Sequence, residues 1–257
     1  MSSIEPELQV LYNIGNALVR EFPYPHIYVP DVFPADFYRE MLRNLPPQSA
    51  LKNLGELGRV TAGNTYPERG VLPLTPQDLA ALEGPQREFW ERLRKWLLGQ
   101  RFGDTMVGKF APYLAQRFGD LRNIRFDHEA LIVRDRTSYA LGPHTDSPSK
   151  VLSFLFYLPA DAARAHLGTS IYVPRDPGFL CQGGPHYDYA KFQRMLTLPY
   201  VPNALFAFMK TPNSFHGVEP IAEPEVRRDL LLYDLRALPP QAQKPAPAAA
   251  SNIKFTI

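Results

Sequence analysis

The second half of this chain consists of short apolar runs that no helical pattern separates. Between residues 124 and 236, runs rich in β-branched and aromatic residues are bounded by Pro, Gly, Asn or Asp, which is typical of β-strands. Because parallel strands need long, usually helical crossovers, the absence of helical patterns between these runs favours antiparallel pairing. Many short strands of this kind predict a sandwich or jelly roll. The runs are 129–135, 151–159, 169–174, 204–210 and 227–235.

The first 123 residues have a different pattern, in which apolar side chains recur at helical spacing. Leu8, Leu11 and Ile14 would lie on one face of a helix. Three further stretches with helical patterns follow, at 34–45, 87–100 and 105–118. We therefore expect an α+β protein, in which a mainly helical support precedes the jelly-roll core.

The expected domain organisation follows from this change of pattern. Residues 1–236 are expected to form a single domain, with the helical support over 1–123 and the core over 124–236. Residues 237–257 are expected to form a Pro/Ala-rich linker and C-terminal tail. The last residues of that tail, 252–257, could return as an edge strand.

Composition excludes several classes of protein. The chain has 257 residues and a formal net charge of only +2, too small to indicate a nucleic-acid surface. Cys181 is the only cysteine, which excludes an intramolecular disulfide and a Cys-based zinc site. No apolar run approaches the roughly 18 residues of a membrane span, and Glu5 and Glu7 stand where a signal peptide would carry basic residues. We expect a cytoplasmic protein, and the sequence does not predict its oligomeric state.

A histidine and an aspartate two positions apart precede one of the apolar runs. In GPHTDSP, His144 and Asp146 would point to the same side of an extended chain. A second such pair, His186 and Asp188, lies in a segment without a strand pattern and is interpreted as part of a loop. His144 and Asp146 lead into the run 151–159, so they are the stronger candidates for metal ligands.

His216 is the candidate for a third ligand, because it follows the apolar run 204–210. Several strands separate it from Asp146, enough to bring the chain across a sandwich and back. Two imidazoles and one carboxylate with open positions suit non-haem Fe(II). The same ligands also suit zinc, which would give a hydrolytic centre, although no general base is evident from the sequence.

The final apolar run carries two arginines into an otherwise apolar strand. Along 227–235, Arg227 alternates with Asp229 on one face, and Arg228 alternates with Leu230 on the other. A buried guanidinium is costly unless it meets an anion, and its parallel donors suit a carboxylate. This strand therefore predicts a position that binds a carboxylate.

Together these features resemble the Fe(II)/2-oxoglutarate-dependent dioxygenases, and among them the prolyl-hydroxylase-like branch. The pattern of that superfamily is His-x-Asp, a distal His and an Arg on the final core strand, and the sequence has these residues in order from His144 to Arg227. The similarity extends over residues 124–236, through YALGPHTDSPSKVLSFLFYLP, LGTSIYVP, NSFHGVEP and RRDLLLYDL. It implies a double-stranded β-helix, which is a cupin-like jelly roll.

The resemblance implies roles for individual residues. Arg227 would pair with the distal carboxylate of 2-oxoglutarate, and Arg228 is the alternative because the alignment of this strand could be displaced by one position. Tyr157 would share the same carboxylate, and Tyr139 would also face the co-substrate. The implied Fe(II) ligands are His144, Asp146 and His216.

The implied activity is a hydroxylation in which dioxygen and 2-oxoglutarate are consumed and succinate and CO2 are formed. The substrate would offer an unactivated C–H bond, on a small molecule or on a carrier-, peptide- or protein-borne residue. Asp146 favours hydroxylation over halogenation, because related halogenases replace this carboxylate with a small residue, whereas desaturation or cyclisation remains open. The alternative is a cupin-like metal-binding sensor or structural protein without oxygenase activity, which would need no arginine on the last strand.

Two further features lie near the expected site in the sequence or between its strands. Lys150 is expected to be the solvated start of a strand. The segment 178–195 has no strand pattern, and long irregular insertions of this type are often functional. It is expected to help cover the active site, with His186 and Tyr187 near the substrate.

Overall fold

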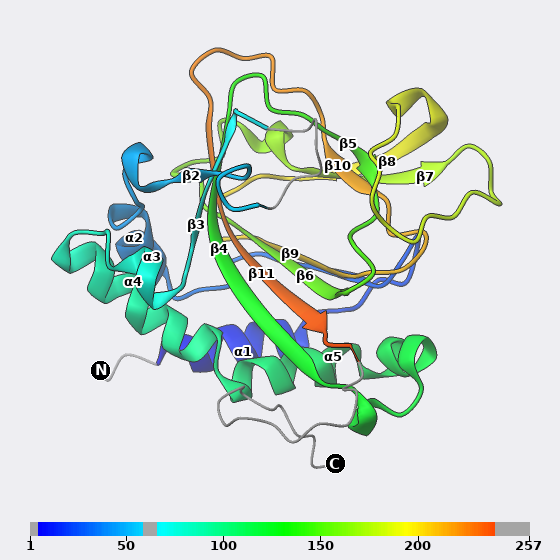
Figure 1. Cartoon of the computed structure of the whole chain (residues 1–257), viewed down its shortest axis with the longest axis horizontal. Coiled ribbons are helices and arrows are strands. Elements are labelled where there is room, and N and C mark those ends of the chain that lie inside the picture. The colour runs from blue at the N-terminus through cyan, green and yellow to red at the C-terminus, as the bar shows by residue number, and fades with distance from the viewer. Residues whose placement is uncertain (1–4, 59–65, 240–257) are drawn as a thin grey trace.

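The chain folds into two antiparallel β-sheets with helices packed against the larger one (Figure 1). The computed structural model describes residues 5–58 and 66–239. Within these residues, the larger sheet has seven strands and the smaller sheet has four. This architecture confirms the expected α+β class and the jelly-roll core.

The large sheet is organised around β11, which lies at its centre. Its strands follow the order β1-β9-β6-β11-β4-β3-β2. β11 pairs with β4 along its whole length and with β6 over most of it. Because other layers cover both faces of this sheet, β11 is apolar on both sides rather than on alternate residues. The strands are β1 (His26–Val29), β2 (Lys52–Asn53), β3 (Arg69–Pro73), β4 (Phe126–Arg136), β6 (Lys150–Tyr157), β9 (Leu205–Met209) and β11 (Arg227–Ala237).

The small sheet has the order β5-β10-β7-β8 and carries two of the expected ligands on neighbouring strands. β10 pairs with β5 so that His216 lies opposite His144. Close pairing here depends on Gly217, because a Cβ at that position would lie 2.3 Å from the Leu141 carbonyl oxygen. The strands are β5 (Leu141–His144), β7 (Thr169–Pro174), β8 (Phe192–Leu198) and β10 (His216–Val218).

The helices cover the face of the large sheet that points away from the small sheet (Figure 1). Phe102 of α5 packs edge-on against Tyr233 of β11, with ring centroids 5.0 Å apart. None of the helices within the described residues is long and apolar enough to cross a membrane. The α-helices are α1 (Pro6–Asn16), α2 (Ala35–Arg43), α3 (Pro76–Leu79), α4 (Gly84–Leu97) and α5 (Gln100–Phe118), and the 3-10 helices are η1 (Gln48–Ala50), η2 (Leu121–Asn123), η3 (Ala165–Leu167) and η4 (Tyr189–Lys191).

A hydrophobic cluster, separate from the one between the helices and the large sheet, fills part of the space between the two sheets. It includes Tyr139, Tyr157 and Leu230 together with Ile171 of the small sheet, all of them buried. Next to this cluster the two sheets enclose polar and charged side chains as well. The candidate site lies there.

Some elements differ from the sequence-based expectation. The first part of the chain contributes three strands as well as helices, and β1, β2 and β3 extend the large sheet. The expected absence of a strand in 178–195 is wrong at its end, because β8 begins at Phe192 and pairs with β7. The expected tail lies mostly outside the described residues, as does the edge strand at 252–257, while β11 continues to Ala237.

Candidate metal centre and its cavity

The structure brings His144, Asp146 and His216 together between the two sheets. His144 ends β5 and His216 begins the adjacent β10, so their paired register places the two imidazole rings 4.4 Å apart. The Asp146 Oδ1 atom lies 3.9 Å from His144 Nε2 and 4.0 Å from His216 Nε2. One ligand atom from each of the three residues therefore lies within 4.8 Å of the others, and all three residues are buried.

Hydrogen bonds aim these three side chains at one point. The Nδ1 atom of each histidine lies 3.0 Å from the carbonyl oxygen two residues earlier, that of Gly142 or Ser214. A backbone carbonyl can only accept, so Nδ1 carries the proton in each ring and Nε2 keeps its lone pair. Ser153 donates a hydrogen bond of 2.8 Å to Oδ2 of Asp146, which leaves Oδ1 facing the two imidazoles.

The electrostatics keep all three groups in the state that binds metals. Burial lowers the pKa of His144 well below its ordinary value, with a further contribution from His216, and burial also lowers the pKa of His216. Burial alone would raise the pKa of Asp146, but Lys150 and the two histidines outweigh it and hold that pKa below its ordinary value. At neutral pH the set is two neutral imidazoles and one carboxylate, the protonation states that metal ligation requires.

The chemistry of this donor set fits a first-row divalent metal ion. Two imidazole nitrogens and one carboxylate oxygen on one side of a point, with the other positions free of protein ligands, match the set found at non-haem Fe(II) centres. Zinc would accept the same three donors. Geometry alone therefore supports a metal centre, and the surroundings have to distinguish the metals.

A cavity of about 100 Å³ adjoins the three candidate ligands. It is lined from β11 by every second residue, with Leu230 and Leu232 between two charged ends. Asp234 stands at the end near the candidate ligands, and Arg228 stands at the other end. A molecule that reached from the metal position to Arg228 would cross an apolar middle.

Arg228 is completely buried at its end of the cavity. Its guanidinium donates to the Leu167 carbonyl oxygen at 2.6 Å and to an Asp135 carboxylate oxygen at 2.6 Å. Asp135 also accepts two hydrogen bonds from Arg69, at 2.7 and 3.0 Å. Arg69 lines the same cavity, so two guanidinium groups held by one buried carboxylate form its far end.

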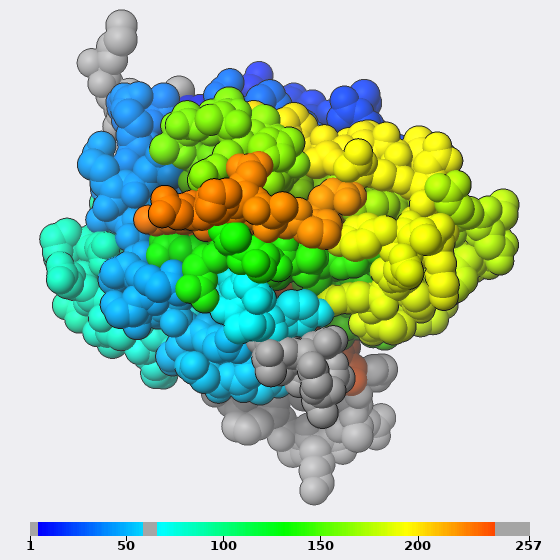
Figure 2. Space-filling view, turned by 90° about the horizontal axis from the view of Figure 1, so that it is seen from above, coloured from blue at the N-terminus to red at the C-terminus, as the bar shows by residue number. Residues whose placement is uncertain are grey.

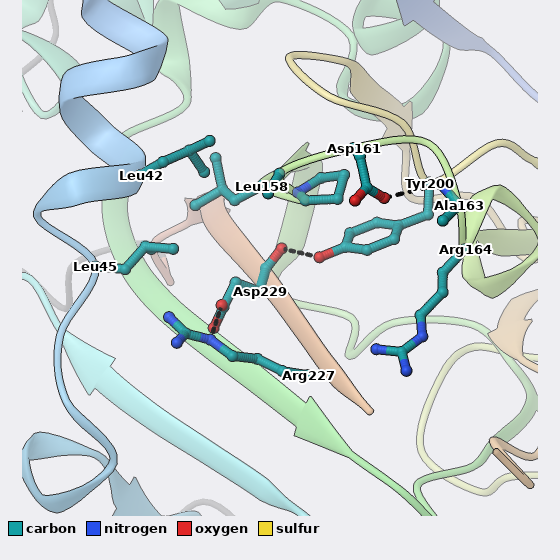
Figure 3. A pocket seen from close by; sticks show the side chains of 11 residues that line it. Leu42, Leu45, Leu158, Asp161, Ala163, Arg164, Tyr200, Arg227 and Asp229 are labelled. Carbon is teal, nitrogen blue, oxygen red and sulfur yellow. Dashed lines mark hydrogen bonds and ion pairs between the residues drawn. The ribbon is translucent and has the colours of Figure 1, made fainter. Parts of the chain in front are cut away.

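Arg227, by contrast, does not line this cavity. Its side chain is 52% exposed and pairs with Asp229. Figure 3 shows it in a separate surface pocket of about 490 Å³, which Leu42 and Leu45 line from the side of α2. Of the two adjacent arginines that the sequence left open, Arg228 lines the cavity that adjoins the candidate ligands, and Arg227 lies on the opposite face of β11.

The two tyrosines that the resemblance implied are both buried beside the arginines at this end, but neither of them lines the cavity. The hydroxyl of Tyr157 accepts a hydrogen bond of 3.2 Å from the Thr169 backbone N–H, and its ring lies 5.9 Å from the Arg228 guanidinium. The hydroxyl of Tyr139 is buried and has no hydrogen-bond partner among the described residues. The Arg69 guanidinium lies 4.3 Å above the Tyr139 ring.

Lys150 is not the solvated residue that the sequence suggested. Its side chain is only 19% exposed and lines the cavity. Its ammonium group lies 3.3 Å from Asp146 Oδ1 and 3.0 Å from Asp234 Oδ2. Burial alone would lower its pKa, but these two carboxylates outweigh it and raise the pKa of Lys150 above its ordinary value.

Sequence reasoning also missed Arg69 and Asp135. Arg69 belongs to the short strand β3, and its partner is brought to it by β3–β4 pairing across more than sixty residues of chain. The one local signal was the sequence VRDR, where charged residues continue an apolar strand. A buried carboxylate at such a position needs a cationic partner.

Part of the segment 178–195 lies directly over the candidate metal ligands. The ring of His186 is 4.6 Å from that of His144, and its Nδ1 is 2.7 Å from the Tyr66 hydroxyl. Tyr187 donates its backbone N–H to the Pro143 carbonyl oxygen at 2.9 Å. Figure 2 shows the surface where the chain after residue 65, in cyan, meets the segment 178–195, in yellow. Tyr66 and His186 make the contact between these two parts of the chain.

Comparisons with known proteins extend the description of the fold. Neither a protein-family model nor a curated protein sequence matches the chain. Among solved structures, the chain is similar to a prolyl 4-hydroxylase from Phytophthora capsici, with a TM-score of 0.54 and 13% identity, over 92% of this chain and 67% of the other. At this identity the likeness establishes a shared fold.

Two further solved structures are similar at lower TM-scores. A Pseudomonas putida prolyl-4-hydroxylase has a TM-score of 0.48 and 14% identity, over 88% of this chain and 98% of the other. HygX from Streptomyces hygroscopicus, solved with nickel and 2-oxoglutarate bound, has a TM-score of 0.44 and 12% identity, over 82% of each chain.

Proposed function

We propose that this protein is an Fe(II)- and 2-oxoglutarate-dependent oxygenase that hydroxylates an unactivated C–H bond. The observation that carries the proposal is the convergence of His144, Asp146 and His216 at one end of a cavity whose other end is the buried Arg228. A zinc hydrolase or a metal-binding sensor would have no use for a buried guanidinium at that place. The substrate would be a small molecule or a carrier-, peptide- or protein-borne residue.

His144, Asp146 and His216 would hold the metal ion through Nε2, Oδ1 and Nε2 respectively. A ferrous ion there would supply, together with 2-oxoglutarate and dioxygen, the oxidising power for C–H hydroxylation. The protein's own contribution is to keep the two imidazoles neutral, to hold Asp146 through Ser153, and to exclude water by enclosing the site between two sheets.

Arg228 would bind the distal carboxylate of 2-oxoglutarate in place of Arg227. Asp135 fixes the orientation of Arg228 and is itself held by Arg69, so the donor is positioned before any ligand arrives. The buried hydroxyl of Tyr139 beside Arg69 has no partner among the described residues, and a buried hydroxyl usually has one, so a bound co-substrate is a candidate acceptor. We therefore assign Tyr139 and Tyr157 to the surroundings of the co-substrate.

The charges around the cavity support a divalent cation together with a dianion. The ionisable side chains that line the cavity, together with the buried carboxylate paired to the arginines, comprise three cations and three carboxylates, with both histidines neutral. A divalent metal ion would leave two positive charges uncompensated in a buried site, which is costly. A dianion such as 2-oxoglutarate would restore neutrality. The six groups are Arg69, Lys150, Arg228, Asp135, Asp146 and Asp234.

The test is an anaerobic titration of the iron-loaded protein with 2-oxoglutarate, which is followed by the weak visible charge-transfer band of the ternary complex. Arg228→Ala is expected to weaken 2-oxoglutarate binding at least thirtyfold, because loss of a buried charge partner costs about 2 kcal/mol or more. Arg227→Ala is the matched control, since it removes the neighbouring guanidinium from the opposite face, and it should bind like wild type.

Each of the other outcomes contradicts a defined part of the proposal. A wild-type band that Arg228→Ala leaves unchanged, in a variant with native circular dichroism, would remove Arg228 from the co-substrate site. If the alanine variant does not fold, 2-oxoglutarate binding is measured in Arg228→Lys, which keeps the charge but not the parallel N–H donors of the guanidinium. Iron binding without any response to 2-oxoglutarate would favour a metal-binding protein without oxygenase activity.

A further inference from the structure

Lys150 contacts the carboxylate oxygen that faces the two histidines. Its Nζ atom lies 3.3 Å from Asp146 Oδ1, the same atom that lies about equally far from the Nε2 atoms of both imidazoles. The other oxygen of Asp146 already accepts the Ser153 hydroxyl at 2.8 Å. The ammonium group therefore neutralises the oxygen that a metal ion would use.

A second carboxylate lies within reach of the same ammonium group. Asp234 Oδ2 is 3.0 Å from Lys150 Nζ, closer than Asp146, and the Asp234 side chain is only 6% exposed. Arg236 is the next cation to Asp234, at 3.8 Å. Asp234 can keep Lys150 paired when Asp146 is engaged elsewhere, so the lysine does not have to leave the protein interior.

We propose that Lys150 is the counterion of Asp146 in the metal-free protein, and that a metal ion displaces it towards Asp234. The inference rests on the metal centre of the proposed function and adds a regulation of its affinity. A cation beside a ligand oxygen repels an incoming divalent ion. Lys150 therefore weakens metal binding, while it spares the metal-free protein a buried unpaired carboxylate.

The direction in which metal affinity changes when Lys150 is removed distinguishes a lysine that competes with the metal from one that only positions Asp146. Ser153 holds Asp146 through the other oxygen, so the carboxylate keeps its direction when Lys150 is changed. A lysine that only positioned Asp146 would improve metal binding, and its removal would weaken it. A lysine that competes with the metal has the opposite effect when it is removed.

The experiment is an anaerobic calorimetric titration of the metal-free protein with Mn(II), without 2-oxoglutarate. Lys150→Met removes the competing charge and should tighten Mn(II) binding at least about tenfold, the order expected for one unit charge acting at this range in a partly screened site. Asp234→Asn keeps the lysine but removes its second partner, which leaves the ammonium on Asp146, and should weaken Mn(II) binding several-fold.

The double variant Lys150→Met/Asp234→Asn completes the set, because it exchanges the ion pair for neutral side chains of similar size. It should bind Mn(II) more tightly than wild type, since the lysine acts through its charge and not through Asp234. Lys150→Arg, which retains a cation, should not tighten binding.

Failure of this inference differs from failure of the proposed function. Wild-type protein that does not bind Mn(II) at all would overturn the metal centre itself. Wild-type binding that Lys150→Met leaves unchanged or weakens, in a variant that unfolds cooperatively, would overturn the competition and leave the metal centre intact. Tightening by Lys150→Met alone together with loss of affinity in Asp234→Asn is the result that supports it.

Discussion

At the scale of single residues, Tyr139 carries a buried hydroxyl next to Arg69, one of the two arginines at the far end of the cavity. It has the only buried side-chain polar atom without a partner in residues 5–58 and 66–239. A buried hydroxyl of this kind costs about 1–3 kcal/mol. We expect Tyr139→Phe to raise the free energy of unfolding of the ligand-free protein by about 1 kcal/mol, as measured by urea denaturation.

Tyr157→Phe is the matched control for this prediction. Its hydroxyl accepts the Thr169 backbone N–H, so its removal leaves a buried donor unpaired and should lower the free energy of unfolding by about 1 kcal/mol. Opposite signs for the two variants would support an unsatisfied Tyr139. A loss of stability in both would mean that the Tyr139 hydroxyl has a bound water as its partner.

At the scale of elements, the connection between β7 and β8 packs closely against the β5–β6 connection, which carries the candidate ligand Asp146. Gly183 has a φ of +123°, and a Cβ there would lie 2.3 Å from the Asp146 carbonyl oxygen. Gly184 has a similar φ of +122°, but a Cβ there would meet none of the described atoms within 4 Å. Both alanine variants share the backbone strain, but only Gly183→Ala adds a steric clash. We expect it to cost at least about 1 kcal/mol more stability than Gly184→Ala.

The comparison is made by urea denaturation of both variants, with Mn(II) affinity as a second measurement. Gly183→Ala should also weaken metal binding, because the clash pushes on the backbone of Asp146, a candidate ligand, and Gly184→Ala should not. Equal losses of stability with equal metal affinities would show that the close approach at Asp146 has no influence on the site.

The sequence predicted the strand-rich core and the candidate ligands better than it predicted which arginine faces them. His144 and Asp146 needed only a local argument, an extended chain that points both side chains to one side, although β5 ends at His144 and Asp146 lies just beyond it. β11 is buried on both faces, with Leu230 towards the cavity and Leu231 towards the helices. The alternation of side chains along β11 predicts that Arg227 and Arg228 lie on opposite faces of the strand, but it does not predict which of these faces lines the cavity.

The residues that were missed depend on contacts between distant parts of the chain. Arg69 meets Asp135 only because β3 pairs with β4, and β3 is a five-residue strand in a region of helical pattern. Lys150 is only four residues after Asp146, but its closer partner, Asp234, lies on β11 and is reached only through the β6–β11 pairing. Pairings of this kind are tertiary properties that no local pattern contains.

At the scale of the whole molecule, the buried histidines make stability depend on pH. Five histidines have pKa values lowered below 6.5, with burial as the largest cause in each. In the unfolded chain they take up protons near pH 6.5, while in the folded protein they do so at lower pH. Stability is therefore full above about pH 6.5 and falls as the pH decreases below it. The five are His26, His128, His144, His186 and His216.

We expect the free energy of unfolding of the metal-free protein to fall by at least about 1.4 kcal/mol between about pH 7.5 and about pH 5, the equivalent of one pKa unit at one histidine. Urea denaturation at several pH values measures it. His26→Asn removes one of these groups from a position that is not among the candidate metal ligands and should make the decline shallower. Stability that stays constant or rises towards pH 5 would contradict the lowered pKa values.

The place of β5 at the edge of the small sheet has a consequence for how copies of this protein behave in solution. An edge strand offers unpaired backbone groups to any neighbouring chain, which favours aggregation. Here the segment before β8 covers that edge, and the backbone N–H of Tyr187 already occupies the Pro143 carbonyl oxygen. The segment that covers the candidate metal ligands thus also shields the strand beneath it, so a chain that lost this cover would be more prone to self-association as well as altered at the candidate site.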